Sequence, residues 1–348
     1  MKNKRLMVAD IEDGDIIIPD SKCYFLVKKS SVKVGKTGKK YIDLDLFDGV
    51  TTVAGKVWDI TEETNEAVQA GNVIQVLTGK VGKYLSNMQI TINDAVIVPP
   101  EKIDSECAGI LPESFYTFEE LKKQWDELME VLVPKHRELV QKFMENEKIW
   151  HLFTTIPGGR SMHHACRRGL WEHSVSVAQS ALAVSDVFDE KYGLDVSLVV
   201  LASMLHDVGK IFEFQINPAT SMVDRYSDRG KLLGHIYMGA TWLEKLVATC
   251  FPEDNDLKMD LIHIILSHHG QYEFGSPKRP KTLEALIVSA CDNLDASCDA
   301  VKSCFGDNME GNWTKPVYMM ERAFFRRQEN GGNGAEIPDE TEEGTFNN

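Results

Sequence analysis

The chain has 348 residues, of which 43% are hydrophobic, and this is enough for about two domains with packed cores. Its longest apolar runs, such as residues 198–205 and 261–266, fall far short of the ~20 residues of a membrane span, and residues 1–10 lack the apolar core of a signal peptide. We therefore expect a cytoplasmic protein without a membrane partner. Seven cysteines with no CxxC pair argue against a disulfide framework and against a cysteine-built zinc site.

The charge of the chain is unevenly distributed. A formal net charge of −15 argues against nucleic acid as a partner of the whole surface, because phosphates repel acidic groups. However, residues 1–100 hold 13 basic and 13 acidic residues, whereas the rest of the chain holds 25 basic and 40 acidic ones. Residues 28–40 contain six lysines and no acid, which is typical of a local nucleic-acid-binding patch or of a solvated hairpin tip.

The first hundred residues are predicted to form a small β-barrel. Apolar and polar side chains alternate along residues 41–48, as in a half-buried strand, and Gly35 to Gly38 supply the turn to the strand before it. A short helix is expected at residues 60–70, ended by Gly71. The predicted strands are 23–33, 41–48, 51–58, 72–81 and 88–98. This β-β-β-α-β-β order is that of an OB-fold, whose open face often binds single-stranded nucleic acid.

The chain from residue 118 onward is predicted to be all-helical. Seven segments have an apolar spacing near 3.6 residues or are apolar throughout: 118–131, 136–147, 170–188, 196–206, 234–247, 257–268 and 282–301. The segments 196–206 and 257–268 are apolar nearly all round, so we expect them at the buried centre of the domain. The expected buried stripe of the last segment consists of Leu283, Leu286, Ile287, Ala290, Leu294 and Val301.

These patterns divide the chain into four parts. Residues 1–100 are assigned to an OB-fold nucleic-acid-binding domain, and residues 101–117, which follow Pro99 and Pro100, to a linker. Residues 118–330 form the helical domain. Residues 331–348 contain five acids and no base, which predicts a disordered acidic tail.

Histidines and aspartates gather at the ends of the most apolar helices. His206 and Asp207 follow one of these helices, His268 and His269 follow another, and His173 lies on the apolar face of a third. Because charge and hydration are costly there, we expect these side chains to converge. Imidazole and carboxylate groups without a thiolate suit a hard or borderline divalent metal. The two oxygens of Asp207 allow it to bridge two ions ~3.5–4 Å apart, an arrangement suited to in-line attack on phosphorus.

Two further charged residues have a local interpretation of their own. Lys210 follows His206 by four residues, so its ammonium falls on the metal side, where it would hold a phosphate oxygen; the alternative is an exposed lysine. Asp292 shares an acidic helix face with Asp295 and Asp299 rather than the apolar stripe. On its own, Asp292 is therefore expected to be a solvated carboxylate.

The ordered motifs resemble a known enzyme family. The segment from Leu205 to Lys210, with His173 upstream and Asp292 downstream, is similar to the H...HD...D pattern of the HD-domain metal phosphohydrolases. A longer series resembles the YhaM-type 3'-5' exoribonucleases. Its members are the segments 162–165, 169–173, 230–236, 266–270, 275–277 and 292–296 in the helical part, and 39–44 and 56–59 in the barrel.

The resemblance covers roughly residues 8–328 and implies an OB-fold followed by an HD metal-dependent phosphohydrolase domain. It implies one metal held by His173, His206, Asp207 and Asp292. It implies a second metal held by Asp207, His235 and one or both of His268 and His269. The two ions would be manganese or a similar divalent metal, which agrees with the nitrogen and oxygen donors. The family likeness also implies self-association.

The activity implied is hydrolysis of the 3'-terminal phosphodiester of single-stranded RNA or DNA, which releases nucleoside 5'-monophosphates. The metals would lower the pKa of water, Asp207 would bridge them, and Lys210 would neutralise charge on the phosphoryl oxygens. The barrel would hold the upstream strand by phosphate contacts and base stacking. Its candidate residues are Lys36, Lys39, Lys40, Tyr41, Phe47 and Trp58.

Several alternatives remain at the level of the sequence. The same metal pair would serve a phosphohydrolase of nucleotides or cyclic nucleotides, and a non-catalytic single-strand-binding protein would keep the metals for structure. A separate alternative for the barrel is that Tyr41 and Phe47 merely cover its face. The preference for RNA or DNA is open, as is a place for Glu172 or His164 in the metal shell.

Overall fold

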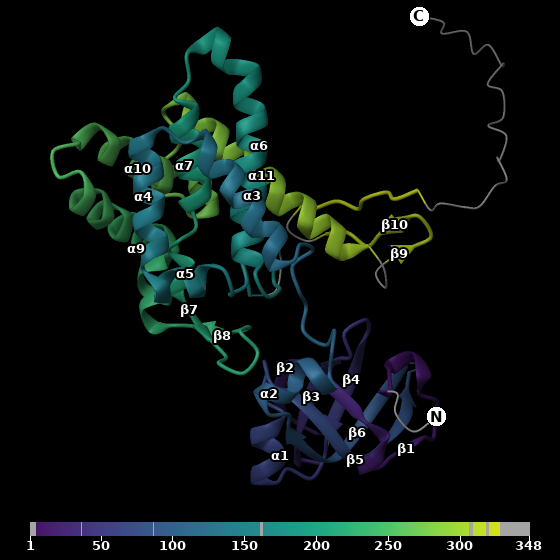
Figure 1. Ribbon diagram of the computed structural model, residues 1–348. Coiled ribbons are helices and arrows are strands. Elements are labelled where there is room, and N and C mark those ends of the chain that lie inside the picture. Colours follow the sequence, from purple (N-terminus) through teal and green to yellow (C-terminus); the bar gives the residue numbers. More distant parts are fainter. Residues whose placement is uncertain are drawn as a thin grey trace, which may run out of the picture. The chain divides into compact units, whose positions relative to one another are not determined.

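The computed structural model describes residues 5–35, 37–85, 87–160, 163–305, 309–317 and 320–327 (Figure 1). The candidate residue Lys36 and the predicted acidic tail, residues 331–348, lie outside the described residues. By its contacts the chain divides into two compact units, Met1–Ala300 and Val301–Asn348. In the described part of the chain, no helix is long and apolar enough to cross a membrane.

The N-terminal strands close into the predicted OB-fold. The order in the sheet is β1-β5-β2-β3-β4-β6, β5 also pairs with β6, and β4 runs parallel to β6. Helix α1 (Glu62–Ala67) lies in sequence between β4 and β5, as the OB-fold requires. The strands are β1 (Ile16–Ile17), β2 (Cys23–Val34), β3 (Lys40–Phe47), β4 (Thr52–Val57), β5 (Val73–Tyr84) and β6 (Asn87–Ile97).

The alternation along β3 decides which side chains fill the barrel. Ile42, Leu44 and Leu46 are almost completely buried in the barrel core, whereas the residues between them face outward. Helix α1 is shorter than the predicted 60–70, because Thr61 caps its N-terminus by accepting a hydrogen bond from the backbone N–H of Thr64.

Part of the expected linker is a helix. Helix α2 (Pro100–Glu106) begins with a proline, a residue that a helix tolerates at its first position. Ile103 and Cys107 are buried with Leu26 of β2 and with Val98. The sequence pattern missed this helix because its apolar residues are too few to show a helical period.

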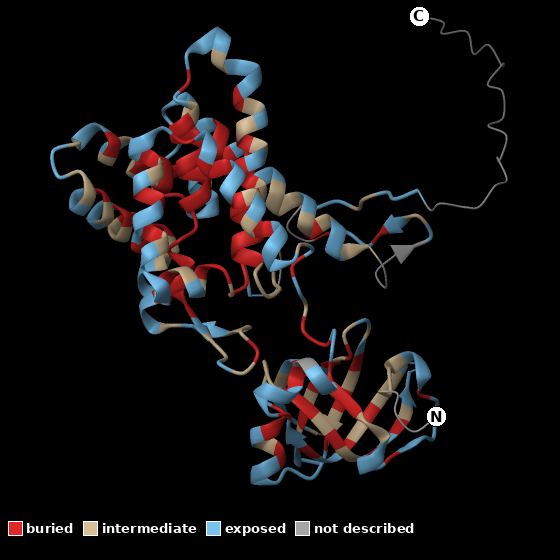
Figure 2. Cartoon of the chain, in the orientation of Figure 1, coloured by how far each residue is buried: buried red, intermediate tan, exposed pale blue. Residues whose placement is uncertain are grey.

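The helical domain contains all seven predicted helices and two short ones that the sequence did not show. The helices are α3 (Phe118–Val131), α4 (Pro134–Glu145), α5 (Glu147–Phe153), α6 (Gly169–Tyr192), α7 (Val196–Leu205), α8 (Lys210–Glu213), α9 (Asp228–Cys250), α10 (Asn255–Ser267) and α11 (Leu283–Cys304). Helix α7 is buried along its length and forms the centre of the core, as predicted (Figure 2). A small hairpin of β7 (Phe214–Ile216) and β8 (Val223–Tyr226) follows α8.

Two boundaries differ from the expected ones for a local reason. Asn146 ends α4 close to the expected end at residue 147, and it caps the separate helix α5 by accepting a hydrogen bond from the N–H of Ile149. Helix α9 begins at Asp228 and is broken at Gly234, whose φ of 72° is a left-handed conformation that glycine adopts readily.

The buried face of α11 is not the stripe expected from its apolar residues. Leu283, Leu286 and Leu294 are exposed, whereas Val288 and the carboxylate of Asp292 are buried. The helix therefore turns part of its charged face inward, toward the histidines described below. Beyond α11, the strands β9 (Met309–Glu310) and β10 (Trp313–Thr314) pair in the second unit.

Candidate metal centre

Asp207 lies where two groups of histidines meet. It follows the last turn of α7, is 2% exposed, and directs its two carboxylate oxygens at different partners. Its Oδ2 lies 3.4 Å from Nε2 of His173 and 3.5 Å from Nε2 of His206. Its Oδ1 lies 3.5 Å from Nε2 of His235 and 3.7 Å from Nε2 of His268.

The first group combines residues of three helices. His173 of α6 and His206 at the end of α7 place their Nε2 atoms 3.1 Å apart. Asp292 of α11 lies with its Oδ1 3.2 Å from Nε2 of His173 and 3.6 Å from Nε2 of His206. The expectation of a solvated Asp292 is therefore wrong, because the residue packs against two buried imidazoles.

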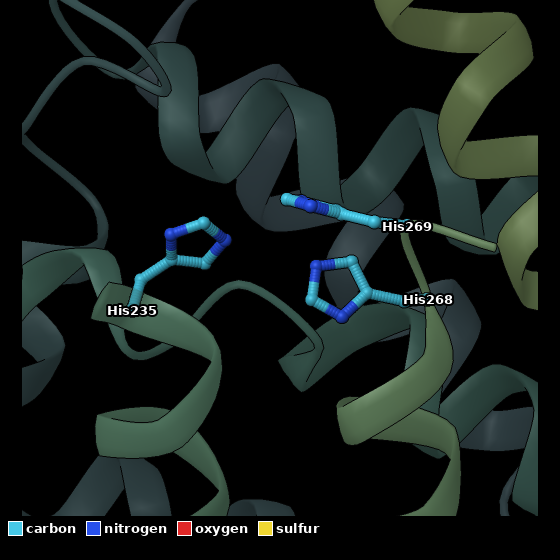
Figure 3. Close-up of side chains that lie close together, drawn as sticks. All are labelled: His235, His268 and His269. Atoms are coloured by element: carbon cyan, nitrogen blue, oxygen red, sulfur yellow. The ribbon is translucent and has the colours of Figure 1, made fainter. Parts of the chain in front are cut away.

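The second group consists of His235, His268 and His269, which Figure 3 shows gathered at one place. His235 comes from α9 just after the break at Gly234, and His268 and His269 follow the last turn of α10. Each of the three offers a ring nitrogen, and these atoms lie within 4.8 Å of one another. Both His268 and His269 are thus near enough to share one ion with His235.

The outer nitrogen of each histidine is held by an acceptor. Nδ1 of His173 lies 2.6 Å from Asp295, and Nδ1 of His235 lies 3.3 Å from Glu213. The other three Nδ1 atoms donate to backbone carbonyl oxygens: His206 to Ser203 at 2.8 Å, His268 to Ile265 at 2.7 Å and His269 to Phe274 at 2.9 Å. A proton held at Nδ1 leaves the lone pair of Nε2 free to bind a cation, as in histidine metal sites generally.

Three buried polar atoms at this place have no hydrogen-bond partner among the described residues: Oδ1 of Asp207, Nε2 of His235 and Nε2 of His268. Leaving such groups unpaired costs free energy unless something else satisfies them. They are a carboxylate oxygen and two imidazole nitrogens, the donors that divalent transition metals prefer. The residues present therefore fit a divalent metal.

The electrostatics of the two groups differ. Burial would lower the pKa of His173, but hydrogen bonds to Asp207 and Asp292 hold that pKa well above its usual value. Burial also opposes the charged form of His206, but the negative charge of Asp207 outweighs it and raises the pKa of His206 to about 9. Burial lowers the pKa of His268 well below its usual value, and the neighbouring His269 adds to the shift. Burial likewise lowers the pKa of His269, so His268 and His269 favour the neutral form, which binds a metal.

Lys210 belongs to the same buried centre. Its Nζ lies 2.6 Å from Oδ2 of Asp207, and its side chain is only 8% exposed. Burial opposes the charge of both groups, yet their attraction outweighs it, so the pKa of Lys210 is raised and that of Asp207 lies well below its usual value. The alternative of an exposed lysine is excluded by this burial.

Asp295 and Glu213 support the histidines, and the sequence did not assign them this role. Oδ2 of Asp295 lies 2.6 Å from Nδ1 of His173 and 2.7 Å from Nε2 of His164. Glu213 accepts hydrogen bonds from the backbone and the ring of His235. The sequence showed Asp295 on an acidic helix face and within the family-like segment 292–296, neither of which gives it a contact with His173. The four-residue α8 that carries Glu213 is too short to show a period.

Of the two residues left open at the level of the sequence, His164 forms a third cluster of possible ligands with His173 and Asp295, whose donor atoms lie within 4.8 Å of one another. The carboxylate of Glu172 accepts a hydrogen bond from the backbone N–H of Phe115, at 3.1 Å. His164 faces Asp295, and its backbone N–H donates to Asp299. His164 is thus linked through Asp295 to His173.

On the barrel, the structure brings together only some of the expected nucleic-acid-binding residues. The rings of Tyr41 and Trp58 lie 4.8 Å apart, and Nζ of Lys56, a residue outside the expected set, lies 4.7 Å from the Tyr41 ring. Lys39 pairs with Asp59 beside Trp58 at 2.5 Å.

The remaining barrel candidates lie apart from this aromatic pair or stand alone. Phe47 lies at the opposite end of β3 from Tyr41, beneath Nζ of Lys28 at 3.8 Å, and packs against the cluster that contains Leu26 and Ile103. Lys40 is exposed at the start of β3.

Comparisons with known proteins agree with this geometry. The HD domain family matches residues 170–297, a range that contains all seven candidate ligands. The second OB-fold domain of replication protein A from Methanococcus maripaludis matches 27% of this chain and 95% of its own, with 19% identity and a TM-score of 0.21. A TM-score this low does not support a fold assignment, so we assign the OB-fold from the strand order of the barrel.

A curated relative spans nearly the whole chain. The 3'-5' exoribonuclease YhaM of Bacillus subtilis strain 168 is 30% identical over 315 residues, which cover 87% of this chain and 93% of that protein. The match is much longer than residues 170–297, which the HD domain family matches. The chain therefore belongs to the YhaM family of 3'-5' exoribonucleases.

Proposed function

We propose that the protein is a metal-dependent 3'-5' exoribonuclease, which hydrolyses the 3'-terminal phosphodiester of single-stranded RNA, or of single-stranded DNA, to nucleoside 5'-monophosphates. The observation that carries the proposal is the position of Asp207, whose two oxygens each face a separate group of histidines. The relative named 3'-5' exoribonuclease YhaM gives the substrate class.

Two ligand sets are proposed around this aspartate. One metal would be held by His173, His206, Asp207 and Asp292, and the other by Asp207, His235, His268 and His269. Two divalent ions, Mn²⁺ or a similar metal by the family resemblance and in agreement with the nitrogen and oxygen donors, would lower the pKa of water and neutralise charge at the phosphoryl group.

The side chains of the protein have separate tasks in this reaction. Asp207 orders both ligand sets, while Asp295 and Glu213 fix the orientation of His173 and His235. Lys210 would donate hydrogen bonds from its ammonium to a phosphoryl oxygen as negative charge grows there. Its burial strengthens that interaction, because the local dielectric constant is low.

The barrel is proposed to hold the strand upstream of the reacting end. The exposed Trp58 and its neighbour Tyr41 offer π-faces that stack on any base, and Lys36, Lys39 and Lys40 supply charge toward phosphates. Phe47 would contact the strand at a second point along β3. We assign residues 1–100 to this task, residues 101–117 to the connection and residues 118–330 to hydrolysis.

The deciding experiment follows the length of a 5'-labelled single-stranded RNA incubated with the purified protein and Mn²⁺, beside a matched DNA strand and a chelator control. A ladder that shortens from the 3' end and vanishes with chelator supports the proposal. An intact strand combined with turnover of free or cyclic nucleotides would favour a nucleotide phosphohydrolase. An intact strand with neither turnover would favour a single-strand-binding protein.

A variant at the bridging residue gives the sharpest prediction. Asp207→Ala removes a ligand of both sets, so we expect loss of bound metal, measured by elemental analysis, and loss of all strand shortening. Asp186→Asn, at an exposed position of α6, is the matched control and should retain both. Near-normal turnover by Asp207→Ala would contradict the assignment of the centre.

A further inference from the structure

The segment that follows the ligands His268 and His269 differs in charge from the rest of its half of the chain. Residues 101–348 hold 25 basic and 40 acidic residues, yet residues 272–281 contain three cations and one acid, Glu273. The cations are Lys278, Arg279 and Lys281, all exposed. None of them forms an ion pair with a residue that the structure describes. Such a local positive surface attracts an anionic ligand.

The same segment exposes two aromatic rings. Tyr272 and Phe274 are 59% and 65% exposed, although each has a large apolar surface. The guanidinium carbon of Arg279 lies 5.0 Å from the centre of the Tyr272 ring. An exposed ring beside cations is the combination that proteins use to bind single strands, because bases stack on the ring while cations contact phosphates.

Hydrogen bonds hold this segment against the metal centre. The ring of His269 donates from Nδ1 to the carbonyl oxygen of Phe274 at 2.9 Å, and His269 itself is one of the histidines in Figure 3. The buried Ser276 hydroxyl lies 3.2 Å from the carbonyl oxygen of Leu266 and 2.7 Å from that of Lys278. The backbone N–H of Lys278 also donates to Leu266, so the segment folds back on the end of α10.

We propose that residues 272–281 bind the 3'-terminal nucleotides of a single-stranded nucleic acid, with Tyr272 stacking on a base and Lys278, Arg279 and Lys281 contacting phosphates. This inference rests on the proposed exonuclease function and extends it, because it assigns a substrate-binding surface next to the metal centre itself. That surface is separate from the aromatic pair on the barrel and would position the scissile phosphodiester.

The test combines Tyr272→Ala with strands that lack one base. Initial rates with Mn²⁺ give KM for an intact strand and for strands with an abasic residue at the first or the second position from the 3' end. We expect Tyr272→Ala to raise KM for the intact strand about tenfold, since base stacking is worth roughly 5- to 150-fold in affinity. The abasic residue at one of the two positions should raise KM of the unmodified protein by a similar factor, but should not raise KM of the variant further.

Two more variants make the result specific. Tyr272→Phe keeps the ring and should keep the coupling to the base. The control is Tyr192→Ala, because Tyr192 is 50% exposed and has Nζ of Lys191 5.0 Å from its ring, but it lies at the far end of α6 from His173. It should keep the KM of the unmodified protein for every strand. The double variant Lys278→Gln and Lys281→Gln should weaken the dependence of KM on salt concentration.

The outcomes separate the two proposals. If Tyr272→Ala and the missing base each raise KM, and their factors multiply at both positions, the 272–281 segment does not stack on the 3' end and the inference is wrong. If the unmodified protein leaves the intact strand uncut, the proposed exonuclease function itself fails, and the substrate assigned to this segment fails with it.

Discussion

At the scale of single residues, the buried carboxylates determine the charge of the histidines around them. Asp207 and Asp292 keep His206 protonated when no metal is bound, because two negative charges lie beside a ring that is cut off from water. A metal ion would bind Nε2 of His206 in place of the proton only when the ring is neutral. At the proposed metal site, protons and metal would therefore compete for Nε2 of His206.

The pH dependence of stability follows from this competition. The pKa of His206 is raised from 6.5 to about 9 in the folded metal-free protein, so its contribution to stability is complete below pH 6.5 and is lost as the pH rises through about 9. In chelator we expect the melting temperature to fall over that range, while with excess Mn²⁺ it should hold or rise. Thermal unfolding measured at both conditions checks this prediction, and a parallel fall with and without metal would contradict it. His206→Gln should flatten the trend in chelator.

At the scale of secondary-structure elements, close packing of α8 on α9 positions His235. A Cβ at Gly209 would collide with the carbonyl oxygen of His235 and would lie 2.7 Å from the backbone nitrogen of Gly239. Backbone atoms give way less easily than side chains, so the two helices can approach this closely only when residue 209 is a glycine.

Gly209→Ala should therefore push His235 away from Asp207. We expect a loss of about 1–3 kcal/mol of unfolding free energy, as for other overpacked sites, together with a higher Mn²⁺ concentration for half-maximal activity. Gly82→Ala is the control, since a Cβ there meets nothing within 4 Å. An unchanged Mn²⁺ requirement in Gly209→Ala would show that this contact does not position the histidine.

The sequence predicted the elements with a strong period and missed those without one. Barrel strands and long helices were predicted because their apolar residues repeat over several turns or pleats, whereas α5 and α8 are too short for that. The local pattern placed Asp292 in solvent, because it lies on an acidic helix face and polar residues usually face water, although the family resemblance implied that it is a metal ligand. On α11 the carboxylates of Asp292 and Asp295 instead face inward, because they contact the imidazole ring of His173, which belongs to α6. The pattern of one helix does not show which side chains the other helices contribute.

At the scale of the whole molecule, the proposed function uses two surfaces with different reach along a nucleic-acid strand. Trp58→Ala on the barrel should raise KM for a long strand about tenfold, because one stacking contact is lost. KM for a strand of three or four nucleotides should stay the same, because that strand is bound beside the metal centre alone. Steady-state rates on the two lengths check this prediction, with Tyr192→Ala as control. An equal effect on both lengths would place Trp58 with the reacting end instead.

The order of the parts along the chain has a consequence for synthesis. The candidate ligands are spread from His173 to Asp292, and the barrel precedes all of them. During translation the barrel, the proposed RNA-binding domain, is synthesised first, whereas the metal centre stays incomplete until α11 has left the ribosome. Under the proposed function, a growing chain would therefore bind RNA before it could degrade any, including the messenger from which it is being made.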